Sequence, residues 1–223
     1  MLQGALQPVQ RSLHLPGVPV ELSDGEGGHE GFFEAGDQHL RSPSPGLPVA
    51  AETAPDTPAP EVLIRTSEGD ITLRLYPDKS PLTVANFLTY VDSGFYNGTI
   101  FHRVKPNFMI QGGGFLPDMT EKATREPVVN ESKNRLHNIR GTVAMARTSD
   151  PDSATSQFFI NQRSNLRLDW SPGKPGYTVF GEVVDGMNVV DFMASAPTGK
   201  VGTFTDVPLE PILIKEIIRL PAP

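Results

Sequence analysis

The sequence predicts a mainly β domain whose antiparallel strands form either a closed barrel or a sandwich. Two observations carry this prediction. Short strand-like segments separated by turn residues fill most of residues 61–223, and only two segments show helical periodicity. One helix-like segment lies near each end of the strand series. This placement favours the barrel, with one helix covering each of its two openings.

The first strands and the first helix have clear signals. EVLIRTSEGDITLRL (61–75) reads as two strands around a Ser-Glu-Gly-Asp turn. SPLTVANFLTYVDSG (80–94) predicts a helix, and its apolar residues recur with helical spacing. Ser80 suits the N-cap, Pro81 the first helical position and Gly94 the end. The expected core-facing stripe is Val84, Phe87, Leu88 and Val91.

Strand-like segments then dominate the chain, and a second, shorter helix is expected over 186–195. A Lys-Pro-Asn turn at 105–107 separates the first two of these segments. The expected strands are TIFHRV (99–104), NFMIQG (107–112), GTVAMAR (141–147), SQFFINQ (156–162), YTVFGEVV (177–184) and PILIKEIIRL (211–220).

Residues 1–60 differ in composition from the rest of the chain. They are rich in proline and glycine and carry most of the formal net charge of −7. We expect a disordered acidic segment that ends in an extended Pro/Ala/Thr linker, followed by a folded domain over 61–223. Because the remaining charge is nearly balanced, a general nucleic-acid-binding surface is not expected.

Composition also limits the compartment and the assembly. The sequence has no run of about 18 apolar residues and no signal peptide, so neither a membrane span nor secretion is expected. A cytoplasmic monomer is the simplest interpretation. A true start further downstream is the alternative, with a periplasmic location, since such a linker is also common in exported proteins.

Several kinds of chemistry find no support in the sequence. The absence of cysteine excludes disulfides, thiolate nucleophiles and zinc–thiolate sites. The five histidines lack metal-ligand spacing, so no metal site is expected. The glycines in QGGGF (111–115) lack phosphate-loop spacing and are interpreted as room for a turn or a close backbone approach. No G-x-S-x-G elbow is present.

Strand periodicity leaves the role of the central aromatic residues open. Alternation predicts four face pairs: Met109 with Gln111, Phe108 with Ile110, Gln157 with Phe159, and Phe158 with Ile160. One face of each strand should enter the core. The other face either packs in the core as well or forms an external groove that mixes Phe, Met and Gln side chains.

Three long motifs resemble the cyclophilin family of peptidyl-prolyl cis/trans isomerases, in its bacterial form. They are FHRVKPNFMIQGGGF (101–115), RGTVAMARTSDPDSATSQFFIN (140–161) and YTVFGEVVDGMNVVD (177–191). The resemblance spans nearly all of residues 62–220. It implies a closed eight-stranded antiparallel β-barrel capped by two α-helices, with the site on the outer barrel surface. It implies no cofactor and no metal.

The resemblance also implies the residues of the site. Arg103 matches the catalytic arginine, Phe108, Met109 and Phe159 match the walls of the proline pocket, and Leu168 matches its edge. The other expected substrate-binding residues are His102 and Gln111 beside the arginine, Ala146 and Arg147 along the substrate backbone, Gln157 in the groove, and Tyr177 where many members have histidine.

The implied activity is the isomerisation of X–Pro bonds in proline-containing peptides and in unfolded or folding proteins, and thereby assistance of protein folding. An arginine without a nucleophile suits a reaction that breaks no covalent bond. Arg147 stands where many members have asparagine, and Arg167 where many have a tryptophan that contacts cyclosporin, so weak cyclosporin binding at most is expected. The rival functions are a peptide-binding or chaperone module without turnover, and a scaffold acting through residues 1–60.

Overall fold

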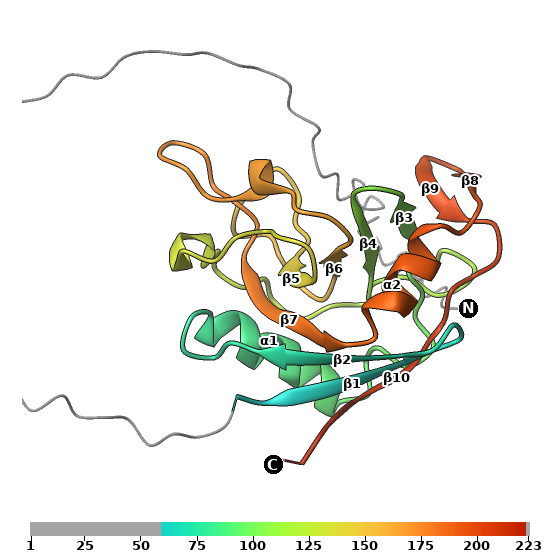
Figure 1. Ribbon diagram of the computed structural model, residues 1–223, viewed down its shortest axis with the longest axis horizontal. Coiled ribbons are helices and arrows are strands. Elements are labelled where there is room, and N and C mark those ends of the chain that lie inside the picture. The colour runs from blue at the N-terminus through green and yellow to red at the C-terminus, as the bar shows by residue number, and fades with distance from the viewer. Residues whose placement is uncertain (1–58, 222–223) are drawn as a thin grey trace, which may run out of the picture.

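The computed structural model describes residues 59–221 and places them in two α-helices, two short 3-10 helices and ten strands (Figure 1). The predicted disordered segment and linker, residues 1–60, lies outside the described residues except for its last two. The strands are β1 (Glu61–Thr66), β2 (Asp70–Leu75), β3 (Arg103–Lys105), β4 (Met109–Gly112), β5 (Thr142–Met145), β6 (Phe158–Asn161), β7 (Val179–Asp185), β8 (Thr198–Val201), β9 (Phe204–Pro208) and β10 (Ile214–Arg219). The helices are α1 (Pro81–Asp92), α2 (Met187–Ala194), η1 (Ser132–Asn134) and η2 (Leu166–Leu168).

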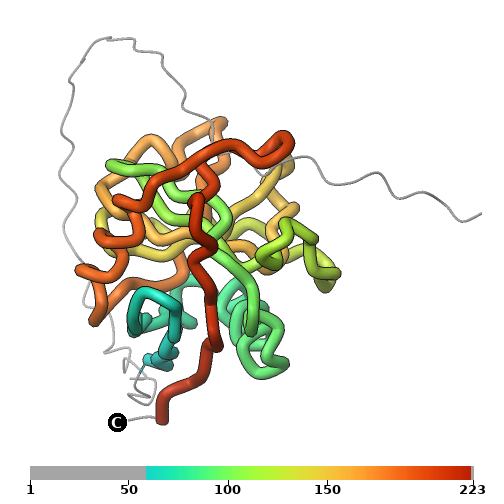
Figure 2. The backbone as a smooth tube through the Cα atoms, turned by 90° about the vertical axis from the view of Figure 1, so that its right-hand side faces the viewer, coloured from blue at the N-terminus to red at the C-terminus, as the bar shows by residue number. Residues whose placement is uncertain are grey.

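Eight of the described strands form one curled antiparallel sheet in the order β10-β1-β2-β7-β5-β6-β4-β3. No ladder joins the edge strands β3 and β10 within residues 59–221, so the closed barrel is not confirmed. The segments just before these strands do meet. The Phe101 N–H donates to Ile212 O at 2.9 Å, and Ile100 forms an isolated bridge with Leu213. In Figure 2 the red C-terminal segment runs beside the green segment that contains these residues.

The strands β8 and β9 form a separate antiparallel hairpin that packs against β3. This hairpin is absent from the predicted strands. In its sequence, TGKVGTFTDVP, the apolar residues Val201, Phe204 and Val207 recur every third position, which is not strand spacing. Pairing in the hairpin also shifts register between Gly199 and Val201.

Helix α1 begins and ends where the sequence predicts, but a different residue satisfies its first turn. Ser80 occupies the N-cap position, yet its hydroxyl donates to Val179 O at 2.8 Å and makes no cap. The Glu131 carboxylate instead accepts from the backbone N–H groups of Leu82 and Thr83, at 3.1 and 2.8 Å. A carboxylate is favourable at this positive end of the helix. Gly94, with φ +65°, follows the helix end as expected.

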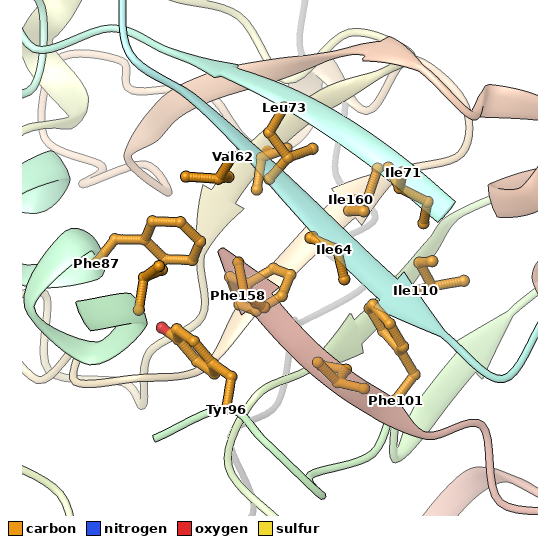
Figure 3. Packing of buried hydrophobic residues seen from close by; sticks show 14 of the residues in the cluster. Val62, Ile64, Ile71, Leu73, Phe87, Tyr96, Phe101, Ile110, Phe158 and Ile160 are labelled. Carbon is orange, nitrogen blue, oxygen red and sulfur yellow. The ribbon is translucent and has the colours of Figure 1, made fainter. Parts of the chain in front are cut away.

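The main core lies between the sheet and the helices. Helix α1 packs near β10, while α2 packs against β2, β3 and β4 (Figure 1). The stripe predicted on α1 is buried in this core. Phe158 lies at its centre, with its ring in edge-on contact with those of Phe87, Tyr96 and Phe101 (Figure 3).

No helix within residues 59–221 has the length and apolar character needed to cross a bilayer.

Alternation along β4 and β6 assigns the two faces of the sheet. Ile110, Phe158 and Ile160 belong to the main core, whereas Met109 and Phe159 lie in a second, separate apolar cluster. The face pair of Phe158 with Ile160 on β6 is therefore confirmed. The pairing of Phe108 with Ile110 is wrong, because Phe108 precedes β4 and belongs to the second cluster. It follows Asn107, whose φ of 57° reverses the chain and breaks the alternation.

Candidate active site

A second apolar cluster covers the outer face of the sheet and is called the outer cluster below. Its buried members are Phe108, Met109, Ala144, Ala146, Phe159, Leu168 and Val179, and Leu136 and Tyr177 pack against them. Strand pairing explains this assembly, because Phe159 lies opposite Gln111 on β4 and opposite Ala144 on β5. The outer cluster thus brings together six of the eleven predicted site residues from segments far apart in the sequence. Ala144, Val179 and Leu136 were not predicted, although Ala144 shares the face of Ala146 by alternation.

Arg103 begins β3 and lies opposite Gln111 in the ladder with β4. Its side chain is 15% exposed, and its Nε lies 3.6 Å from Oδ2 of Asp206. The Nη1 atom is buried and has no hydrogen-bond partner among the described residues. A buried donor without a partner is costly, and a bound group that accepts from Nη1 would remove this cost.

Two glutamine side chains continue the site beside the arginine. The Gln111 amide Nε2 donates to Gln157 Oε1 at 3.1 Å, and Gln157 Nε2 lies 3.5 Å from Glu121 Oε1. Gln111 Oε1 is buried and unpaired within the described part of the chain. Among the described residues, the site therefore holds an unpaired donor on Arg103 and an unpaired acceptor on Gln111, and Nδ1 of the neighbouring His102 is buried and unpaired as well.

The glycines after Gln111 create the space that these side chains occupy. A Cβ added to Gly114 would lie 2.6 Å from Gln157 Cγ and 2.9 Å from its Nε2. Gly113 has φ +86°, and a Cβ there would lie 2.9 Å from the rings of Phe158 and Tyr96. The interpretation of QGGGF as a turn with close backbone approach is confirmed.

We expect Gly114→Ala to lower the isomerisation rate that the family resemblance implies by a few-fold to about tenfold, because the new methyl group displaces Gln157 and breaks its bond to Gln111. The rate on a proline-containing peptide checks this. Gly199→Ala is the matched control, since its Cβ meets only Leu209, which is 66% exposed and free to turn away. Equal rates for the two variants would contradict the role given to Gly114.

Tyr177 and Arg147 close one side of the outer cluster. The Tyr177 ring lies edge-on to Phe159 with centroids 5.7 Å apart, and burial raises the pKa of its hydroxyl. The Arg147 guanidinium lies 4.4 Å from the Tyr177 centroid and donates to Pro175 O at 2.9 Å and to Gly176 O at 3.3 Å. The Arg147 side chain thus supports the loop before Tyr177. The Ala146 N–H donates to Gln157 O at 3.0 Å and is therefore already paired within the protein.

Cationic side chains lie at the other side, over Phe108. The Arg167 Cζ and the Lys105 Nζ lie 5.6 and 5.8 Å from the centroid of the Phe108 ring. Trp170 is outside the outer cluster, 38% exposed, with Lys133 Nζ 5.6 Å from its ring. Weak cyclosporin binding stays a prediction.

A depression of about 400 Å3 adjoins the Phe108 side of the outer cluster and is lined by Asn107, Arg163, Ser164, Asn165, Leu166 and Arg167.

The position of His102 does not support its prediction as a substrate-binding residue. It is 4% exposed and packs its ring edge-on against Phe115, with centroids 4.6 Å apart. Burial, reinforced by the charge of Arg103, lowers the pKa of His102 to about 3. His102 is therefore a neutral packing residue next to Arg103.

The buried neutral His102 makes stability depend on pH. Its pKa is lowered from 6.5 in the unfolded chain to about 3, so the unfolded state binds more protons between these values. Acidification below pH 6.5 should therefore lower the free energy of unfolding more steeply in the wild type than in His102→Gln. The expected difference in slope is up to about 1.4 kcal/mol per pH unit. Urea unfolding between pH 7 and 4.5 measures it, and parallel slopes would contradict a buried neutral imidazole.

The geometry suits recognition of an apolar ring next to a polar group. Arg103 offers an unpaired cationic donor, Gln111 an unpaired acceptor, and the outer cluster an apolar surface. Within residues 59–221 no group of three or more His, Asp or Glu side chains is arranged to hold a metal ion. Asp206, which contacts Arg103, was not predicted, because it comes from the unpredicted hairpin β8–β9.

The chain is similar to known proteins in sequence and in fold. Residues 61–218 match the family model described as cyclophilin type peptidyl-prolyl cis-trans isomerase/CLD. The chain is 55% identical over 159 residues to peptidyl-prolyl cis-trans isomerase A of Dickeya dadantii, a match that covers 71% of this chain and 84% of that protein. It is 54% identical over 159 residues to peptidyl-prolyl cis-trans isomerase B of Escherichia coli, covering 70% and 97%.

A solved structure agrees with these sequence matches. It is a cyclophilin type peptidyl-prolyl cis-trans isomerase of Cryptosporidium parvum, determined in the presence of the dipeptide Ala-Pro. Its TM-score is 0.62 at 32% identity, and the match covers 71% of this chain and 97% of that one. Since the family model spans almost the whole described region and bacterial isomerases exceed half identity, the chain belongs to the cyclophilin-type peptidyl-prolyl cis-trans isomerases.

Proposed function

We propose that this isomerase binds the proline ring of its substrate on the outer cluster and acts on the X–Pro bond through Arg103. The observation that carries the proposal is the buried Nη1 donor of Arg103, which has no partner among residues 59–221 and belongs to the strand next to the cluster. The related Cryptosporidium parvum structure, determined with Ala-Pro present, supports a proline-containing peptide as the substrate class.

The reaction requires no nucleophile. Rotation about a peptide bond has a barrier of about 18–20 kcal/mol because the C–N bond has partial double-bond character. Twisting the X–Pro bond removes this conjugation and localises the lone pair on the prolyl nitrogen. A donor that bonds to this lone pair binds the twisted amide more tightly than either planar isomer, and this difference accelerates the reaction.

Each group of the site has a proposed part in this step. The Arg103 guanidinium donates to the prolyl nitrogen, which can accept a hydrogen bond only when the amide is twisted, because its lone pair is delocalised in the planar amide. The outer cluster holds the ring through Phe108, Met109, Phe159 and Leu168, and excludes water from the hydrogen bond. The unpaired Oε1 of Gln111 accepts from a backbone N–H of the substrate or orients Arg103.

Exchange spectroscopy on an Ala-Pro-containing tetrapeptide tests the proposed substrate class. The purified chain should accelerate cis–trans exchange at substoichiometric amounts, and a peptide with Ala in place of Pro should not compete. The proposed assistance of folding is tested on a protein whose slow refolding phase is prolyl isomerisation. Binding of the peptide without acceleration would favour the rival function of a peptide-binding module.

A further inference from the structure

The hairpin β8–β9 brings one carboxylate to the candidate catalytic arginine. Oδ2 of Asp206, on β9, lies 3.6 Å from Nε of Arg103, and the two side chains are 31% and 15% exposed. The strand that carries Asp206 packs directly against β3, which carries Arg103. The contact therefore joins residues of two strands that pack against each other.

The backbone of Asp206 is held in an unusual conformation. Its φ is 59°, in the left-handed region that residues other than glycine adopt at a cost. Two residues earlier, the Phe204 ring packs edge-on against Phe115 at 5.2 Å, and Phe115 packs against His102 at 4.6 Å. This aromatic stack ties β9 to the residue next to Arg103, so the surrounding packing fixes Asp206 in the strained position.

The Asp206 carboxylate lies at only one edge of the Arg103 guanidinium. The carboxylate faces Nε, while Nη1 stays buried and without a partner in the described structure. Because the guanidinium is planar and rigid, fixing one edge also fixes the direction of the opposite N–H groups. An ion pair at 15% exposure is moreover screened less than one in open solvent.

We propose that Asp206 is a positioning residue that aims Nη1 of Arg103 at the prolyl nitrogen. This inference rests on the proposed role of Arg103. Asp206 acts through the arginine and does not touch the substrate. Its removal therefore lowers the turnover number and leaves KM nearly unchanged, because ground-state binding depends on the outer cluster.

Three substitutions at Asp206 separate the carboxylate from the backbone. Asp206→Ala should lower kcat by roughly tenfold to a hundredfold, as expected when a catalytic group loses its orientation. Asp206→Gly removes the backbone strain and should be equally slow. Asp206→Asn keeps an acceptor and tolerates the positive φ, so it should recover activity to within about threefold of the wild type. Glu210→Ala, which removes an exposed negative charge after β9, is the matched control and should be unaffected.

A double-mutant cycle decides whether Asp206 works through Arg103. On the Arg103→Ala background, Asp206→Ala should cause no further loss, because the group it positions is gone. An equal loss on both backgrounds, or wild-type kcat for Asp206→Ala, would overturn the inference. Wild-type activity of Arg103→Ala would overturn the proposed function itself. If Arg103→Ala lowers kcat but Asp206→Ala keeps the kcat of the wild type, only the positioning role of Asp206 is rejected.

Discussion

Arg103→Ala is expected to lower kcat/KM for an X–Pro peptide by about a hundredfold or more while the domain stays folded. The removed Nη1 is the donor proposed for the twisted amide, and loss of one such donor typically lowers turnover by about 100-fold to 1000-fold. Arg103 lies on the edge strand β3, outside the main core, so the fold should tolerate the change. A protease-coupled proline-peptide assay, run at equal folded concentration by circular dichroism, measures the loss.

Two further variants make this result specific. Arg103→Lys keeps the charge but replaces the planar fork by a flexible ammonium group, so it should retain at most about a tenth of the activity. Arg65→Ala is the matched control, because Arg65 also lies on a strand and pairs with a carboxylate, that of Glu216, but belongs to β1. An Arg103→Ala enzyme as fast as Arg65→Ala would contradict the assignment.

Much of the fold could be predicted from local signals. Helix α1 has a proline at its first position, a glycine beyond its end and an apolar stripe, and the structure confirms all three. The six strand-like segments after α1 each overlap a strand of the eight-stranded sheet, although β3 and β7 run one residue beyond the predicted ends. In these segments propensity, periodicity and tertiary packing favour the same structure.

Features that depend on distant residues could not be predicted. Glu131 caps α1 from 48 or more residues away, and nothing local marks it as a cap. The closed barrel was predicted from the helix-like segments near the two ends of the strand series and from the family resemblance, but closure depends on whether the edge strands pair. Within the described residues, no ladder joins β3 to β10, and the segment before β3 reaches only Ile214, the first residue of β10, and the residues just before it. The hairpin β8–β9 lacks strand periodicity altogether.

The site residues also divide into those that local patterns predict and those that depend on distant parts of the chain. Periodicity separated Phe158 from Phe159 but left open whether the second face is core or groove. The structure assigns Phe158 to the main core and Phe159 to the outer cluster. Phe108 lies beyond a backbone reversal that a strand pattern does not contain, and Asp206 comes from the unpredicted hairpin. The catalytic and substrate-binding roles of the named residues stay predictions. The substitutions Arg103→Ala and Phe108→Ala test them.

Phe108→Ala is expected to raise KM and lower kcat together, with a loss in kcat/KM of about tenfold or more. If the ring of Phe108 forms one wall of the proline pocket, its removal forfeits roughly 1.5 kcal/mol of apolar contact with the substrate. About 1.4 kcal/mol corresponds to a factor of ten. KM rises because the wall binds the proline ring in the ground state, and kcat falls because a loosely held ring no longer keeps the prolyl nitrogen aligned with Arg103.

The stability of the same variant distinguishes a pocket wall from a core residue. Phe108 belongs to the small outer cluster, whereas the Phe158 ring contacts those of Phe87, Tyr96 and Phe101 in the main core. Phe158→Leu should therefore lower the free energy of unfolding by more than about 1 kcal/mol and leave kcat/KM of the folded enzyme near that of the wild type. Phe108→Ala should show the larger loss of activity. If Phe108→Ala lost only stability and kept its kcat/KM, the outer cluster would be a second core and the proline ring would bind elsewhere.

Because Phe108 and Phe158 are both buried phenylalanines, at 3% and 0% exposure, burial alone cannot distinguish these roles. Measuring activity and stability separately does distinguish them, since only a residue that touches the substrate changes KM without a matching loss of folded protein.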